Sequence, residues 1–204
     1  ARVEMLSLSE QGSSRWQILD AHFDHVVVAT PAWDAASLVA PFNANWSRAA
    51  SALTHEAIAT VYVQAPIDVR LPQPMLSLAS STEAPAQFVF DRGQMMAQQD
   101  MPGLLAFVVS AANGSKQELE IKVLRQAQDL LRTLNMKLAS DSLEVLQTVV
   151  EKRATFACTP QLHRPAANPF EGLSVCGDYV AGPYPATLEG AVMSGCDAGR
   201  HAGA

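Results

Sequence analysis

Residues 173–195 read LSVCGDYVAGPYPATLEGAVMSG. The apolar residues Leu173–Cys176 predict a short strand, and the glycines and prolines that follow predict a loop. Small and apolar residues then recur at helical spacing, which predicts a helix that begins near Ala186 and Thr187. The start of a helix presents unpaired backbone N–H groups and a positive dipole, both of which suit an anionic or electron-rich ligand.

The N-terminal part of the chain also predicts strands followed by helices. Residues 3–6 and 16–19 flank a turn at residues 11–14 and predict two strands of a hairpin or meander. The β-branched run Phe23–Thr30 ends at Pro31 and predicts a strand buried on both faces of a parallel sheet. Helical patterns follow over residues 33–39 and 46–53.

The middle of the chain predicts an antiparallel sheet covered by one helix. Apolar alternation and β-forming residues mark the expected strands of this sheet, at residues 58–63, 75–78, 87–91 and 104–111. Residues 143–156 alternate imperfectly and predict an extended strand that returns toward the first domain. Ser115 and Glu118 form a capping-box pattern that starts a helix running to Leu134. Residues 160–171 are rich in Pro and Asn and predict a loop.

These patterns predict an α/β (α+β) fold in which the chain leaves one domain and returns to it. Residues 1–40 and 151–204 are expected to form one domain, and residues 41–150 are expected to form a second domain with a mixed or antiparallel sheet.

The stretch that ends the chain also carries a family resemblance. Gly177-Asp178 together with Pro185–Gly195 resembles the C-terminal FAD-binding signature of flavin amine oxidases, protoporphyrinogen oxidases and carotenoid desaturases. The resemblance implies FAD as cofactor, with Asp178 near the ribityl and pyrophosphate groups and the start of the last helix at N1 and the C2 carbonyl of the flavin. The implied cofactor-binding residues are Val3, Gly177, Asp178, Pro185, Ala186, Thr187, Leu188 and Glu189.

Other segments resemble the same superfamily. Arg2-Val3 is similar to a strand whose backbone contacts the adenine, and Phe23–Pro31 is similar to the motif Ala-Asp-x-Val-Val-x-Ala-x-Pro, with Phe23 in place of Ala. Residues 88–93, 104–111 and 151–160 look most like hydroxysqualene dehydroxylase. This likeness implies that the parent enzyme converts hydroxysqualene to squalene in hopanoid synthesis, with hydride supplied by reduced FAD.

One family feature does not occur in these residues. The Gly-x-Gly-x-x-Gly fingerprint, which with an acidic residue holds the ADP half of FAD, is missing from the sequence. We therefore expect the chain to be a C-terminal fragment that binds FAD poorly and is inactive by itself.

Composition excludes several other classes of function. The net charge is −6 and the basic residues are scattered, so nucleic acid is not an expected partner. The three cysteines and five histidines show no metal-ligand spacing, so no metal is expected. No apolar run is long enough to span a bilayer. We expect a cytoplasmic protein, with peripheral contact at the inner membrane surface because a squalene-like substrate is lipid-soluble.

Several alternatives remain open at this point. Asp91 and Arg92 are weak catalytic candidates, but a solvated ion pair is the more ordinary interpretation. A second set of residues could line an isoprenoid tunnel or simply pack a core: Met75, Met95, Met96, Met101, Phe88, Phe90 and Phe107. The alternative functions are a carotenoid or phytoene desaturase, an amine oxidase, and a non-catalytic module whose residues 186–195 are covered by another copy, giving a homo-oligomer.

Overall fold

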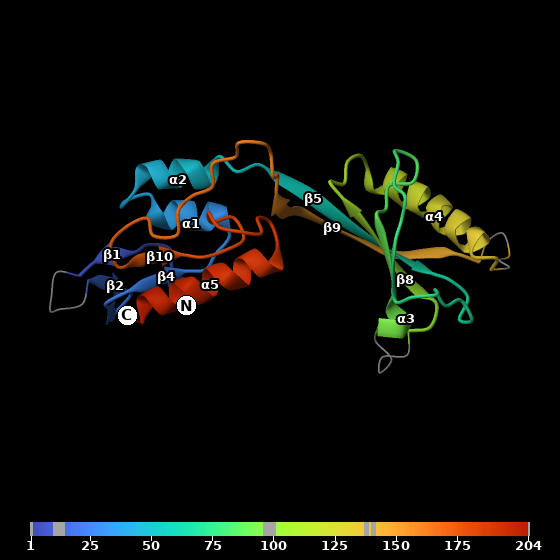
Figure 1. Cartoon of the computed structure of the whole chain (residues 1–204), viewed down its shortest axis with the longest axis horizontal. Helices are drawn as coiled ribbons and strands as arrows, with labels where there is room; N and C mark the ends of the chain where they lie inside the picture. The colour runs from blue at the N-terminus through green and yellow to red at the C-terminus, as the bar shows by residue number, and fades with distance from the viewer. Residues whose placement is uncertain (1, 10–14, 96–100, 137–138, 140–141, 204) are drawn as a thin grey trace. The chain divides into compact units, whose positions relative to one another are not determined.

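The computed structural model describes residues 2–9, 15–95, 101–136, 139 and 142–203. The chain divides into two compact units, each with its own apolar core. The first unit comprises residues 1–54 and 156–204, and the second comprises His55–Thr155 (Figure 1). The predicted α/β (α+β) class, with a parallel strand pair and an antiparallel sheet, is confirmed.

The unit boundaries differ from those drawn on the sequence at residues 40 and 150. Helix α2 (Ala44–Ser51) follows α1 (Ala32–Val39), and both helices contribute to the core of the first unit. Asn43 caps α2 by accepting a hydrogen bond from the Trp46 backbone N–H at 3.0 Å. The indole N–H of Trp46 donates to the Ala166 carbonyl at 2.7 Å, which ties α2 to the loop before the last strand.

Three short strands form an antiparallel sheet in the first unit. Strand β2 (Trp16–Ile18) lies between β1 (Ser7–Leu8) and β3 (Ala21–Phe23). The predicted hairpin is confirmed, although its turn at residues 11–14 lies outside the described residues. The first strand begins at Ser7 and not at Val3, because only Ser7 and Leu8 find pairing partners in β2.

The long apolar run at Phe23–Thr30 is two strands and not one. Phe23 pairs with Trp16 in the antiparallel sheet, whereas β4 (Val26–Val28) pairs in parallel with β10 (Leu173–Val175). The parallel pairing is confirmed. The expected burial on both faces is wrong at Val27, which is 39% exposed, while Val26 and Val28 point into the core.

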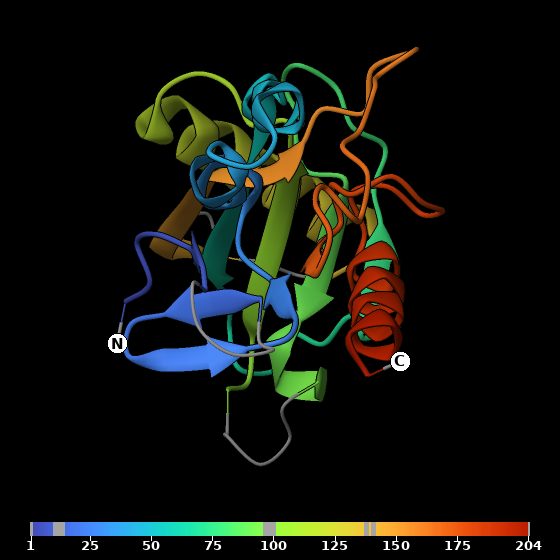
Figure 2. The same cartoon turned by 90° about the vertical axis from the view of Figure 1, so that its left-hand side faces the viewer.

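Helices lie on both sides of the β4–β10 pair. Helices α1 and α2 cover one side, and α5 (Leu188–Ala202) contacts both strands from the other (Figures 1 and 2). Near the end of α5, His201 makes an edge contact with His25, whose Nε2 lies 2.9 Å from the Ser174 hydroxyl. This contact packs the end of α5 against the residue that precedes β4.

The second unit is a five-stranded sheet in the order β6-β7-β8-β5-β9. Its strands are β5 (His55–Gln64), β6 (Met75–Ser77), β7 (Phe88–Asp91), β8 (Leu104–Ser110) and β9 (Glu144–Phe156). A short helix, α3 (Arg92–Met95), follows β7, and α4 (Lys116–Thr133) covers one face of the sheet (Figure 1). The predicted strands and helix of this unit are confirmed.

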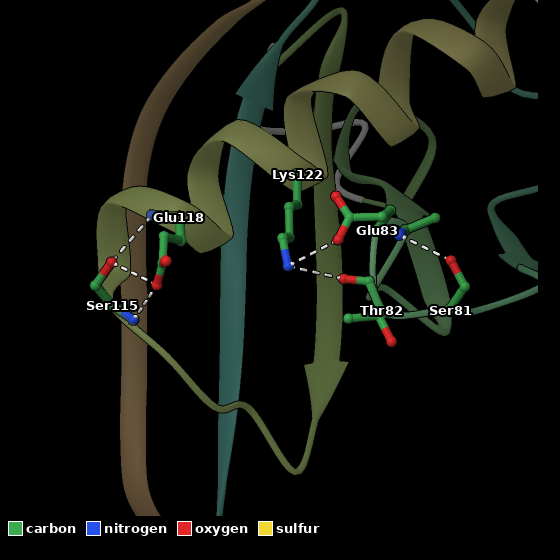
Figure 3. Close-up of polar contacts among 7 residues, drawn as sticks. Ser81, Thr82, Glu83, Ser115, Glu118 and Lys122 are labelled. Carbon is green, nitrogen blue, oxygen red and sulfur yellow. Dashed lines mark hydrogen bonds and ion pairs between the residues drawn. The ribbon is translucent and has the colours of Figure 1, made fainter.

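Helix α4 is fixed at its N-terminal half by polar contacts. Ser115 and Glu118 form the predicted capping box, in which each side chain binds the backbone N–H of the other residue. One helical turn further on, the Lys122 ammonium donates to the Thr82 carbonyl at 3.0 Å and pairs with Glu83 at 3.3 Å (Figure 3). These contacts tie α4 to the loop between β6 and β7.

Strand register separates the residues of the sheet into two faces. The helix face packs under α4 and includes Val61, Val89, Leu105 and Phe107. The far face lies opposite α4 and includes Met75, Phe90, Ala106 and Tyr62, which are neighbours in register on four adjacent strands. Phe107 is therefore a core residue, whereas Phe88 and Phe90 are on the far face.

None of the described helices has the length and apolarity needed to cross a bilayer. Within the same described residues, no three His, Cys, Asp or Glu side chains come together as a metal site.

Candidate functional site

The predicted site residues of the last segment follow the ends of two parallel strands. Strand β10 ends at Val175 and β4 ends at Val28, and the Cys176 N–H donates to the Val28 carbonyl at 3.0 Å. Residues that follow parallel strands gather at one edge of a sheet, which is where ligands bind in open α/β folds. Gly177 and Asp178 lie at this edge, next to Ala29 and Thr30.

A buried tyrosine joins the two loops at this edge. The Tyr179 hydroxyl donates to the Thr30 carbonyl at 3.0 Å. Position 177 has no room for a side chain beside the ring of Tyr179, because a Cβ added to Gly177 would lie 2.5 Å from the ring carbon Cε1. The Gly177 N–H also donates to the Ser194 hydroxyl at 3.2 Å, so the loop is attached to α5.

Two titratable groups at this edge, Tyr179 and Cys176, are held in their neutral forms. Burial, followed by the neighbouring Cys176 and Asp178, raises the pKa of the Tyr179 hydroxyl, which therefore stays a hydrogen-bond donor. Burial also raises the pKa of the Cys176 thiol. The half-buried carboxylate of Asp178 makes no hydrogen bond with any described residue and is available to a ligand.

The first turn of α5 provides unpaired backbone donors. Thr187 is the N-cap: its hydroxyl oxygen accepts from the Gly190 N–H at 3.0 Å, and its hydroxyl donates to the Tyr184 carbonyl at 2.6 Å. The N–H groups of Leu188 and Glu189 have no acceptor among the described residues. The predicted helix start is confirmed, and it leaves two N–H groups for an external acceptor.

The loop before α5 is tightly shaped. Tyr184 and Ala186 have positive φ angles of 53° and 57°, which L-residues rarely adopt. Gly190 lies against this loop so closely that a Cβ would overlap the Tyr184 carbonyl oxygen. Pro185 and Ala186 therefore lie beside the free N–H groups in a fixed conformation.

Val3 lies in a separate cleft of the same unit, with a volume of about 630 Å³. The cleft is lined by Arg2, Val3, Glu4, Thr30, Asp34, Ser37 and Leu38. Because Thr30 lines this cleft and accepts the hydrogen bond from Tyr179, the structure brings Val3 to the same edge as the Asp178 loop. Sequence reasoning did not identify Thr30 or Tyr179, since their contact joins residues 149 positions apart.

Asp91 and Arg92, the weak catalytic candidates, lie in the second unit. Asp91 is 2% exposed, so it is not part of a solvated ion pair. Its carboxylate accepts from the Leu71 N–H at 3.0 Å, the Gln94 N–H at 3.1 Å and the Gln94 side-chain amide at 2.7 Å. The Asp91 carboxylate thus caps α3 and holds the segment before β6, which is a structural role.

We expect Asp91→Ala to lower the free energy of unfolding of the second unit by about 2–4 kcal/mol, because it leaves buried N–H groups without an acceptor. Urea unfolding followed by circular dichroism measures this cost. Asp129→Ala removes an exposed carboxylate on α4 as a control, and its effect should stay within about 0.5 kcal/mol. Equal effects of the two substitutions would contradict the structural role of Asp91.

Comparison with known proteins identifies the family. A sequence profile of the flavin containing amine oxidoreductases matches residues 5–202. The chain belongs to this family. None of the curated proteins compared with it matches.

Solved structures share the fold of this flavin amine oxidoreductase chain. A candidate protoporphyrinogen oxidase from Exiguobacterium sp. 255-15 is 15% identical, with a TM-score of 0.57, over 97% of this chain and 46% of its own. An oxidoreductase from Methanosarcina mazei is 16% identical, with a TM-score of 0.60, over 96% of this chain and 48% of its own. A protein from Pyrococcus furiosus is 12% identical, with a TM-score of 0.60, over 92% of this chain and 43% of its own. The chain spans less than half the length of these proteins.

Proposed function

We propose that the protein containing this chain is an FAD-dependent oxidoreductase and that the first unit forms the flavin end of its cofactor site. The observation that carries this proposal is the pair of free N–H groups at Leu188 and Glu189, beside the ends of two parallel strands. Membership of the flavin containing amine oxidoreductase family supports it.

The residues at this edge have the chemistry that a flavin cofactor requires. The N–H groups of Leu188 and Glu189 are donors for the electron-rich carbonyl side of the ring, where the helix dipole favours negative charge. The free carboxylate of Asp178 is an acceptor for hydroxyl groups of the ribityl chain. The cleft at Val3 and Thr30 has room for the adenine end. Gly177, Pro185, Ala186 and Thr187 shape the loop that presents these groups.

For the substrate, we propose an apolar isoprenoid and, most specifically, hydroxysqualene. The far face of the second unit supports an apolar substrate, since Met75 and Phe88 are 50% and 38% exposed there. The reaction would be reductive dehydroxylation: FAD, when bound and reduced, supplies hydride to the carbon that loses its hydroxyl, and the hydroxyl leaves with a proton as water. A cytoplasmic enzyme acting on this substrate would contact the inner membrane surface.

An amine substrate is less well supported than an isoprenoid. An aromatic cage needs more than one aromatic side chain facing the ligand. Of the two tyrosines of the first unit, Tyr179 is buried and donates its hydroxyl to the Thr30 carbonyl, so only Tyr184 is exposed. A carotenoid or phytoene desaturase would use the same apolar face, and the turnover experiment below separates it from hydroxysqualene dehydroxylation.

Flavin binding and turnover test this proposal. FAD would be titrated into the purified chain and into the chain joined to the Gly-x-Gly-x-x-Gly segment that its family carries. We expect tight binding only by the joined protein, which should convert hydroxysqualene to squalene under anaerobic reducing conditions, with squalene detected by gas chromatography. Flavin binding by neither protein would contradict the cofactor proposal, and desaturation of phytoene instead would contradict the substrate proposal.

A further inference from the structure

The second unit contains a cavity of about 330 Å³ that has apolar walls and a few polar groups. Tyr62 of β5, Leu104 of β8 and three residues of β9 line it, together with Arg92 and Met101; the three from β9 are Leu146, Gln147 and Val149. Small-molecule sites in proteins commonly combine apolar walls with a small number of placed polar groups.

Two polar side chains of this cavity have hydrogen-bonding capacity to spare. Among the described residues, neither the Tyr62 hydroxyl nor the Gln147 amide makes a hydrogen bond. Tyr62 is half-buried, so a ligand that occupies the cavity would shield its hydroxyl from water. A ligand oxygen at this point would gain a hydrogen bond in apolar surroundings, where such bonds are electrostatically stronger than in water.

An apolar strip leads away from Tyr62 along the far face of the sheet. In register, Tyr62 is opposite Ala106, Ala106 is opposite Phe90, and Phe90 is opposite Met75. Side chains opposite each other in antiparallel strands point to the same face, and neighbouring strands are about 4.8 Å apart. The strip therefore runs about 14 Å across four strands.

We propose that this cavity binds the oxygen-bearing part of an otherwise apolar, isoprenoid-like ligand, with Tyr62 as the specificity-determining donor to its hydroxyl. The hydrocarbon part lies along the strip from Ala106 to Met75.

The isoprenoid identity of this ligand rests on the proposed function. Binding of the ligand at this cavity does not need flavin. Two probes with the same carbon skeleton separate the hydroxyl from the hydrocarbon: geraniol and 2,6-dimethylocta-2,6-diene. Their binding to the purified chain is measured from the free ligand in the headspace above the protein solution, by gas chromatography.

We expect the chain to bind geraniol about three- to tenfold more tightly than the hydrocarbon, because one additional hydrogen bond contributes a free energy of that size. Tyr62→Phe should abolish this preference and leave hydrocarbon binding within twofold of the unsubstituted chain. Tyr184→Phe removes an exposed hydroxyl in the first unit and should change neither affinity. Gln147→Met, at an exposed position of β9, should reduce the preference without affecting folding.

Three results would overturn the proposal: an unchanged preference in folded Tyr62→Phe and Gln147→Met, no preference in the unsubstituted chain, or no binding of either probe. Circular dichroism verifies folding of each variant. Flavin titration of the joined protein carrying Tyr62→Phe keeps the two proposals distinguishable. Normal flavin binding with no alcohol preference removes only the cavity proposal, whereas alcohol preference without flavin binding removes only the cofactor proposal.

Discussion

Gly190→Ala should lower the free energy of unfolding of the first unit by about 1–3 kcal/mol, the usual cost of overpacking a tight site. Gly190 is buried in the first turn of α5, and an added Cβ would overlap the Tyr184 carbonyl oxygen and lie 3.3 Å from that of Pro183. Both obstacles are backbone atoms, so the helix start must shift. The flavin affinity of the joined protein should fall at least tenfold, since the N–H groups move with it.

Tryptophan fluorescence during urea unfolding measures this effect, because Trp16, Trp33 and Trp46 all lie in the first unit. Gly195→Ala is a matched control in the same helix, where an added Cβ meets nothing within 4 Å. It should stabilise the unit by about 0.5–1 kcal/mol, because alanine favours helix more than glycine does. If Gly190→Ala were as stable as Gly195→Ala, the close contact with the Tyr184 loop would be wrong.

Phe107→Ala should destabilise the second unit by about 3–5 kcal/mol, because it empties a fully buried site under α4. Phe88, on the neighbouring strand, is 38% exposed on the far face, and Phe88→Ala should cost less than about 1.5 kcal/mol. The two substitutions make the same chemical change on opposite faces of one sheet, so their effects on stability can be compared directly.

Hydrogen exchange at the backbone amides of β5 and β8 measures the loss of stability of the second unit in each of the two variants. Similar losses of stability for the two substitutions would contradict the division of the sheet into a packed face and a far face.

The elements that the sequence predicted well are those with strong local signals. Ser115 and Glu118 predicted the start of α4 because a capping box needs only neighbouring residues. The glycines and prolines between Cys176 and Thr187 likewise predicted the strand, loop and helix that end the chain. For these segments, short-range chemistry and tertiary packing favour the same conformation.

The features that sequence missed depend on long-range contacts. The apolar run that begins at Phe23 looked continuous, but Phe23 pairs with Trp16 and Val26 pairs with Leu173, so two sheets divide it. Asp91 looked like a surface charge, yet its carboxylate binds the Leu71 N–H, 20 positions away. No local pattern encodes such partners, and the same holds for the bond between Tyr179 and Thr30.

Leu188→Pro tests whether the free N–H groups at the start of α5 bind the flavin. Proline removes one of these N–H groups but is well accepted at the first position of a helix. Thr187 before it already has the extended backbone that proline requires, with φ −130° and ψ 156°. The Leu188 side chain is 87% exposed, so its loss costs little packing.

The measurement is the dissociation constant of FAD from the joined protein, compared between Leu188→Pro and Leu188→Ala. Alanine keeps the N–H and removes the same side chain, so it is the matched control. We predict that Leu188→Pro weakens FAD binding about tenfold relative to Leu188→Ala, as expected for one hydrogen bond to an electron-rich acceptor. Equal FAD affinities in two folded variants would contradict the assignment of the α5 N-terminus to the flavin.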